Sequence, residues 1–268
     1  MKTSTVISLS PTDFSALTYE KDFEKGIKKI AKLGFDGIEL AVANPKEIDE
    51  KKFVGLINSL SLKVPAIGTG QAYLRDGLSF IDPRKEIREK AVARIKSHIE
   101  FASEFDAQVI IGLIRGRINE GVNKENAETW CLECITRCAD YAAEYDVSLT
   151  IEPINRYETN FINTVQEGIS FIKQVNRKNF CLLLDTFHMN IEEKSIYESI
   201  RKSKNYLTHF HFADSNRLAP GQGHLDFKKI IETLKEIKYN GFVSAEILPF
   251  PNPDESVKLT IEFFKKML

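Results

Sequence analysis

Four side chains of the kinds that bind metal ions follow four short apolar runs in the second half of the sequence. Three are carboxylates and one is an imidazole, each 26 to 35 residues from the next: Glu152, Asp185, His211 and Glu246. A lone acid at a strand end is usually solvated or caps a helix, but four such residues at consecutive run ends favour a shared site. Oxygen-rich donor sets with one imidazole suit Mn²⁺, Mg²⁺ or Co²⁺ better than they suit a structural zinc ion. We therefore predict one divalent cation, with Mn²⁺ the first expectation and Co²⁺ or Mg²⁺ the alternatives.

Two of these ligands, Glu152 and Glu246, could also carry protons. A proton beside a ketone can be removed when a cation stabilises the resulting enediolate. Two bases on opposite sides of a flat intermediate of this kind can exchange its proton. We predict that these two glutamates do acid–base work.

The elements that must position these residues are eight strand-like runs, which alternate with amphipathic segments. The strand-like runs are Thr5–Leu9, Gly37–Ala41, Lys63–Gly68, Gln108–Leu113, Ser148–Glu152, Phe180–Asp185, Tyr206–Phe212 and Phe242–Ile247. Helical spacing marks Phe23–Leu33, Ile87–Phe105, Trp130–Tyr145 and Phe227–Ile237, among others. This alternation predicts an α/β fold, a single (β/α)8 TIM barrel over residues 1–268. The four candidate ligands then meet at the C-terminal mouth, where barrel active sites lie.

Three further polar residues lie just past the ligand-bearing strands. They are Glu158, His188 and Arg217. Each has an alternative role: Glu158 could neutralise Arg156, His188 could cap the next helix, and Arg217 could hold Asp214. Their shared position past these strands favours contact with a substrate.

The third and fourth strand ends bear on the nature of that substrate. Gln71 follows Gly68-Thr69-Gly70, whose small residues suit close approach of a polyol. Arg115 and Arg117 follow the fourth strand. Guanidinium forks bind carboxylates in pairs of hydrogen bonds, so a sugar acid stays open as a substrate. The alternative for both arginines is a salt bridge to loop acids.

Several segments resemble a known family. Ile151–Arg156, Leu184–Glu193 and His209–Arg217 are similar to the sugar isomerase/epimerase barrels related to xylose isomerase. Within them, the resemblance is strongest to the D-tagatose 3-epimerase and D-psicose 3-epimerase branch, whose members epimerise ketoses at C3. The stretch Asp-Thr-Phe-His-Met-Asn-Ile-Glu-Glu, from Asp185 to Glu193, is the most specific match.

The resemblance implies a role for each candidate residue. By it, the four strand-end residues bind the metal, Glu152 and Glu246 exchange the proton, and Glu158, His188 and Arg217 hold the substrate. It also implies a small-molecule keto-sugar or keto-sugar acid as the substrate, and a homo-oligomer, either a dimer or a tetramer.

Other activities fit parts of the pattern. A 5-keto-L-gluconate-type epimerase, an aldose–ketose isomerase, and a keto-inositol isomerase or dehydratase would use similar ligands, and the sequence does not separate them. A non-catalytic sugar-binding barrel would not need both acid–base glutamates. A DNA-repair nuclease of the endonuclease IV type gathers zinc with many histidines, whereas this chain has five and no basic excess.

Composition limits the remaining classes. The 37 Lys and Arg nearly balance 38 Asp and Glu, so a net charge of −1 gives no reason to expect a nucleic-acid or membrane partner. The start of the sequence does not resemble a signal peptide, and we expect a cytoplasmic protein. Cys131, Cys134 and Cys138 have helical spacing and, without an evident fourth zinc ligand, are expected to be buried thiols. Cys181 lies inside an apolar strand.

Overall fold

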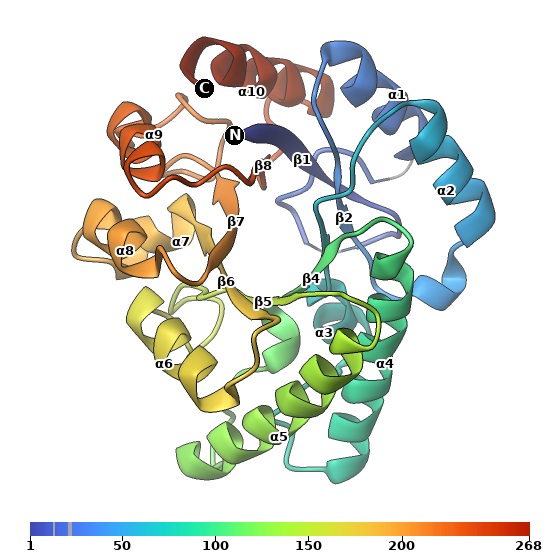
Figure 1. Ribbon diagram of the computed structural model, residues 1–268, viewed down its shortest axis with the longest axis vertical. Coiled ribbons are helices and arrows are strands. Elements are labelled where there is room, and N and C mark those ends of the chain that lie inside the picture. Colours follow the sequence, from blue (N-terminus) through green and yellow to red (C-terminus); the bar gives the residue numbers. More distant parts are fainter. Residues whose placement is uncertain (13, 21–22) are drawn as a thin grey trace.

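Eight parallel strands form a closed barrel in chain order, with helices around the outside (Figure 1). The computed structural model describes residues 1–12, 14–20 and 23–268. The barrel closes where β1 pairs with β8, from Lys2 opposite Phe242 to Thr5 opposite Ala245. The expected (β/α)8 fold is therefore confirmed.

The strands lie close to the expected runs and are mostly shorter. They are β1 Lys2–Ser8, β2 Glu39–Ala41, β3 Ala66–Gly68, β4 Gln108–Ile111, β5 Leu149–Ile151, β6 Phe180–Asp185, β7 Leu207–Phe212 and β8 Phe242–Ala245. The four candidate ligands sit at or directly after the ends of β5, β6, β7 and β8. The strand direction thus brings them to one mouth of the barrel.

The outer layer contains helices on every side. Those described are α1 Phe23–Leu33, α2 Glu50–Ser59, α3 Gly70–Asp76, α4 Lys85–Ser103, α5 Lys124–Ala143, α6 Val165–Val175, α7 Thr186–Glu192, α8 Ile196–Ser203, α9 Phe227–Glu236 and α10 Pro253–Met267, with short 3₁₀ turns η1 Pro45–Glu47 and η2 Leu113–Arg115. Within the described ranges, none of them has the length and apolar character needed to cross a membrane.

Local capping and residues with positive φ set the ends of several helices. Helix α5 begins six residues before the predicted Trp130, because the side chain of Asn123 accepts bonds from the first backbone N–H groups. Helix α1 ends at Leu33 and is followed by Gly34, whose φ of +91° is readily adopted only by glycine. After α9, Lys238 takes the left-handed conformation (φ 62°).

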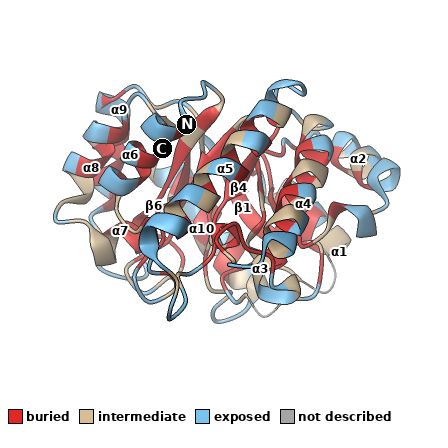
Figure 2. Cartoon of the chain, turned by 90° about the horizontal axis from the view of Figure 1, so that it is seen from below, coloured by how far each residue is buried: buried red, intermediate tan, exposed pale blue. Residues whose placement is uncertain are grey.

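The alternation of β7 shows how the barrel separates site from core. Phe210 and Phe212 point outward, where Phe212 contacts the ring of Phe227 on α9 at 5.2 Å between centroids. His209 and His211 alternate with them and point inward. Figure 2 shows the buried strands at the centre and the exposed outer faces of the helices. On α5, the three expected thiols Cys131, Cys134 and Cys138 are buried and free.

Candidate metal and sugar site

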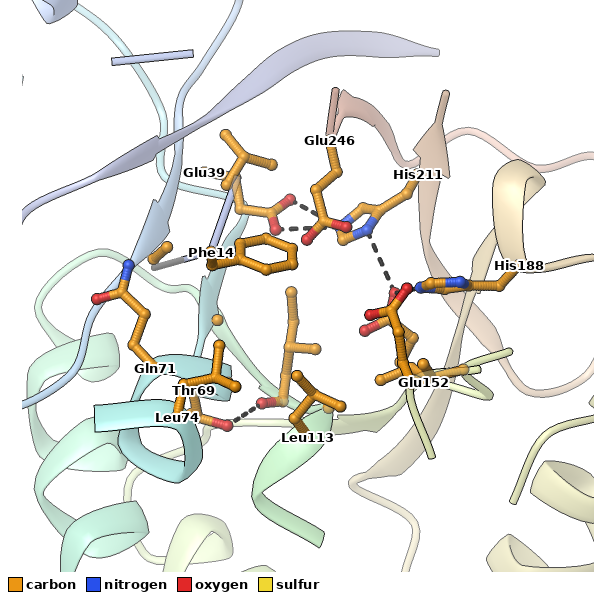
Figure 3. A pocket seen from close by; sticks show the side chains of 18 of the residues that line it. Phe14, Glu39, Thr69, Gln71, Leu74, Leu113, Glu152, His188, His211 and Glu246 are labelled. Carbon is orange, nitrogen blue, oxygen red and sulfur yellow. Dashed lines mark hydrogen bonds and ion pairs between the residues drawn. The ribbon is translucent and has the colours of Figure 1, made fainter. Parts of the chain in front are cut away.

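A pocket at the C-terminal mouth of the barrel collects most of the predicted site residues (Figure 3). Its polar lining includes Glu39, Gln71, Glu152, Glu158, His188, His211, Arg217 and Glu246. Apolar side chains, Phe14 and Leu74 among them, line it as well, and the Arg217 guanidinium lies 5.2 Å from the centre of the Phe14 ring. The pocket therefore combines charged groups with apolar surface.

Among the buried polar atoms of this site that have no hydrogen-bond partner, three face one another: Glu152 Oε1, Asp185 Oδ2 and His211 Nδ1. His211 Nδ1 lies 3.5 Å from Glu152 Oε1 and 3.6 Å from Asp185 Oδ2. Buried polar atoms are seldom left unpaired, since each unpaired atom costs about 1–3 kcal/mol. Two carboxylate oxygens and an imidazole nitrogen facing one another fit a divalent cation.

Asp185 serves both roles that a strand-end acid can take. Its Oδ1 caps α7 by accepting bonds from the backbone N–H groups of Phe187 (2.6 Å) and His188 (3.2 Å). Its Oδ2 stays free and faces His211. The cap fixes the carboxylate, so the second oxygen is held in a defined direction toward the cation site.

Glu246 lies close to two of the other expected ligands, Glu152 and Asp185. One ligand atom from each of these three residues and from His188 falls within 4.8 Å of the rest, whereas His211 belongs to a neighbouring cluster with Glu39 and His209. Burial raises the pKa of Glu246 to about 8, and the carboxylates of Glu152 and Asp185 push the pKa in the same direction. A carboxyl with a pKa near neutrality can both hold and release a proton.

Arg217 joins two of the acids across the mouth. Its guanidinium donates to Glu158 Oε1 at 2.9 Å and to Glu246 Oε2 at 2.8 Å. The backbone of Arg217 is in the left-handed region (φ 61°), an uncommon conformation for a side-chain-bearing residue. The turn is held by its N–H bond to the Asp214 carbonyl, 2.8 Å long. Asp214 thus orients Arg217 through the backbone, not through the side-chain pair considered as an alternative role for Arg217.

His188 is fixed in one tautomer by Asn155. The amide nitrogen of Asn155 donates to His188 Nδ1 (2.8 Å) and to Glu158 Oε1 (2.8 Å). His188 Nδ1 therefore accepts, which leaves Nε2 to carry the hydrogen in the neutral ring. Burial lowers the pKa of His188, so the neutral ring is favoured. Glu158 does not pair with Arg156, whose partner is Glu192 at 2.8 Å.

The two residues expected from the third and fourth strands have different outcomes. Gln71 lines the pocket, and its amide nitrogen donates to Ser8 Oγ at 2.7 Å. Arg115 does not reach the substrate side of the mouth. Its fully buried guanidinium donates to three backbone carbonyls, of Gly112, Phe161 and Ile162. The expectation that Arg115 contacts substrate is therefore wrong, because the short η2 turn directs this side chain into the protein. Arg117 is exposed.

Glu39 is a site residue that the sequence reasoning missed. It is the charged residue within the apolar run Gly37–Ala41, which was the available signal. Its carboxylate is 1% exposed and accepts bonds from His209 and His211. Burial disfavours the ionised carboxylate, but the charges and N–H groups of the two histidines outweigh it and lower the pKa of Glu39. For His211, the surrounding acids outweigh burial and raise its pKa.

Comparison with known proteins assigns this architecture to a family. Residues 27–267 match the family described as the xylose isomerase-like TIM barrel. This chain belongs to that family. Among xylose isomerase-like proteins it is 34% identical over 256 residues to the D-psicose 3-epimerase of Ruminiclostridium cellulolyticum, covering 92% of this chain and 85% of the relative. It is also 28% identical to a 3-dehydro-D-guloside 4-epimerase of Escherichia coli, covering 88% and 90%.

Solved structures of the family show the same barrel. The D-psicose 3-epimerase of Clostridium cellulolyticum H10, solved with D-tagatose, superposes with a TM-score of 0.85 at 28% identity, over 100% of this chain and 99% of that one. A D-allulose 3-epimerase from Methylomonas sp., solved in complex with D-allulose, gives 0.86 at 26% identity, over 100% and 97%. The resemblance to the ketose 3-epimerase branch is confirmed.

Proposed function

We propose that this protein is a metal-dependent epimerase that inverts C3 of a free ketose. The observation that carries the proposal is the trio of buried, unpartnered atoms on Glu152, Asp185 and His211, with Glu246 beside them. The similar D-psicose and L-ribulose 3-epimerases support the same reaction class. We assign these four residues as the ligands.

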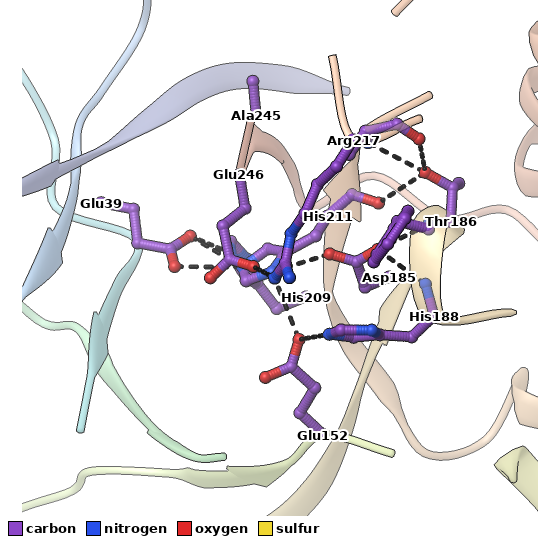
Figure 4. Close-up of polar contacts among 12 residues, drawn as sticks. Glu39, Glu152, Asp185, Thr186, His188, His209, His211, Arg217, Ala245 and Glu246 are labelled. Atoms are coloured by element: carbon purple, nitrogen blue, oxygen red, sulfur yellow. Dashed lines mark hydrogen bonds and ion pairs between the residues drawn. The ribbon is translucent and has the colours of Figure 1, made fainter. Parts of the chain in front are cut away.

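The directions from which the two glutamates reach the site support a role for them on opposite faces of a flat intermediate. Figure 4 shows Glu152 and Glu246 reaching the site from opposite sides of the His211 ring. When bound, a divalent cation would stabilise the negative charge that develops on the oxygens of the deprotonated sugar. One glutamate removes the C3 proton, and the other, in its protonated form, returns a proton to the opposite face.

The remaining polar residues hold the sugar oxygens. His188 presents its Nε2–H, because Nδ1 is engaged by Asn155. Arg217 supplies a positive charge beside the sugar oxygens. Its ion pairs with Glu158 and Glu246 hold the guanidinium in place. Glu158 accepts from Arg217 and Asn155 and keeps lone pairs for a sugar hydroxyl. These three are therefore the proposed substrate-binding group, with Gln71 on the far side.

The charges in the pocket favour a neutral ketose over a keto-sugar acid. Arg217, the one arginine that lines the described pocket, is already bonded to two carboxylates. Arg115, which could have received a sugar carboxylate, is bonded to backbone carbonyls instead. A carboxylate entering beside Glu152, Glu158 and Glu246 would meet repulsion without a dedicated partner.

The identity of the metal ion and the cellular compartment are proposed from the chemistry of the residues. We propose Mn²⁺ as the bound ion, since three carboxylates and one imidazole suit it, with Co²⁺ and Mg²⁺ as competitors. The four cysteines are free, which suits a reducing compartment such as the cytoplasm. A dimer or tetramer remains our prediction for the assembly.

Proton NMR in D₂O would test the proposal. The purified protein is incubated with Mn²⁺ and a panel of ketoses, 3-keto-glycosides and keto-sugar acids, and the Mn²⁺ is removed before each spectrum, with a chelator-treated control. We expect deuterium at C3 and a new C3 epimer for a neutral ketose only when metal is present. An aldose product would replace the proposal with an aldose–ketose isomerase. The absence of exchange with every compound would overturn it.

A further inference from the structure

Glu39 and His209 form a buried pair that the proposed reaction does not use. Glu39 lies on β2, and its side chain reaches the inward face of β7 (Figure 4). In the closed barrel, β1 and β8 lie between these two strands. Both side chains are at most 1% exposed. Removing a carboxylate from water is unfavourable unless strong partners replace the solvent. The position of Glu39 therefore calls for a specific role.

The hydrogen bonds of Glu39 determine which nitrogen of His211 is free. Glu39 Oε1 and Oε2 lie 3.0 and 3.1 Å from His211 Nε2. An ionised carboxylate only accepts hydrogen bonds, so His211 Nε2 must carry a hydrogen. In the neutral ring, the lone pair is then on Nδ1, which is the atom that faces Glu152 and Asp185 without a partner.

His209 holds the carboxylate from the other side. Its Nε2 lies 2.7 Å from Glu39 Oε2, the shortest of these contacts. The two imidazole rings meet edge to face, 5.2 Å apart at an interplanar angle of 84°. His209 does not line the pocket, so it reaches the cation site only through Glu39 and His211.

We propose that Glu39 and His209 are positioning residues, which hold His211 in the tautomer whose Nδ1 binds the cation. The inference rests on the proposed function only in assuming that a divalent cation occupies the site. Partners that hydrogen-bond the second nitrogen of a metal-bound histidine commonly change metal affinity about 10- to 100-fold when mutated. Here the carboxylate comes from a strand far from β7 in the chain.

The same three residues could in principle form a second cation site, since one ligand atom from each lies within 4.8 Å of the others. A cation there would have to replace the bonds from Glu39 to both rings. The two readings differ in stoichiometry. A positioning role predicts one ion per chain, and a second site predicts two.

Mn²⁺ titration of the metal-free protein, by calorimetry and by electron paramagnetic resonance, tests the inference without any sugar. Glu39→Gln cannot accept from both rings through a carboxylate, and we expect its affinity to fall about 10- to 100-fold. His209→Gln keeps a donor near the position of Nε2 and should bind nearly as wild type, whereas His209→Leu should bind several-fold more weakly. His98→Gln changes a buried histidine on α4 whose ring bonds the Arg94 and Val42 carbonyls and no site side chain, and it is the control for general destabilisation.

Nitrogen-15 NMR of the histidines in the Zn²⁺-loaded wild type gives a second readout that does not depend on a variant folding. We expect His211 to be protonated at Nε2 and bound through Nδ1. Binding through Nε2, unchanged Mn²⁺ affinity in Glu39→Gln, or two ions per chain would each overturn the inference. If the Mn²⁺ affinities of the variants follow the expected order but the wild type exchanges no ketose proton, the proposed function is refuted and the inference stands.

Discussion

Single residues at the mouth divide the work between holding a cation and moving a proton, and Glu246 does both in the proposed reaction. Changing Glu246 to Gln leaves an amide oxygen that can still coordinate weakly but cannot carry a proton. We expect turnover and C3 deuterium exchange to fall about 10²- to 10⁴-fold, with Mn²⁺ still bound. Steady-state kinetics and metal titration on the same sample measure both. Near-normal turnover would refute the two-base mechanism.

Arg217 contributes both a positive charge and a guanidinium that bridges two carboxylates. Lys at this position keeps the charge but cannot reach Glu158 and Glu246 at once, as the two arms of the guanidinium do. Loss of one hydrogen bond between charged groups corresponds to about 1.5–3 kcal/mol, or roughly 10- to 100-fold in kcat/KM. We expect this decrease in Arg217→Lys, with the circular dichroism spectrum unchanged. Activity within twofold of wild type would show that bridging is not needed.

Among the elements, the η2 turn depends on a buried arginine. The guanidinium of Arg115 ties this turn to the loop at Phe161 and Ile162 by bonds of 2.9 to 3.0 Å. In Arg115→Met these carbonyls lose their donors, and we expect the free energy of unfolding to fall by about 3 kcal/mol or more. Arg117→Met is the matched control, since this exposed residue should change stability by less than about 0.5 kcal/mol. Urea unfolding compares the two. Equal stabilities would contradict the structural role.

Helix α4 is joined to the end of β2 through His98, which makes this contact sensitive to pH. The ring nitrogens lie 2.8 Å from the Arg94 carbonyl and 2.9 Å from the Val42 carbonyl. Burial lowers the pKa of His98 to about 4 despite these two acceptors. The unfolded chain, with an ordinary histidine pKa near 6.5, binds the proton first. Stability contributed by the neutral ring is therefore present above about pH 6.5 and is lost as the pH falls toward 4.

At pH 5 this linkage amounts to about 2 kcal/mol. Urea unfolding of wild type and His98→Gln at pH 7 and pH 5 should show a smaller loss in the variant, which has no proton to take up. An equal loss in both proteins would remove His98 as a source of the pH dependence.

For the whole molecule, the cation would link strands that are distant in sequence. Glu152, Asp185, His211 and Glu246 come from four consecutive strands, and Glu39 connects β2 to the same cluster. Mn²⁺ at about 100 times its Kd should stabilise the folded protein by about 2.7 kcal/mol, because the unfolded chain has no assembled site. Thermal unfolding with Mn²⁺ and with chelator measures the difference. Identical melting temperatures would argue against a cation at this site.

The sequence by itself determined the barrel and the positions of the four proposed ligands in it, because both depend on local order. The spacing of apolar runs predicts strand–helix repeats, and a residue at a strand's C-terminal end has only one mouth to face. The positions of Glu152, Asp185, His211 and Glu246 followed from that rule. So did Glu158, His188 and Arg217, which lie a few residues beyond the same strands.

Only the tertiary structure decided the roles of Glu39 and Arg115. The partners of Glu39 are some 170 residues away, and the bond exists because barrel closure brings β2 and β7 to face the same interior. Arg115 follows a strand as the proposed site residues do, but the η2 turn directs its guanidinium to buried carbonyls. A side chain's direction after a strand depends on the backbone of one short turn and on what neighbouring loops offer it. Sequence spacing does not encode either.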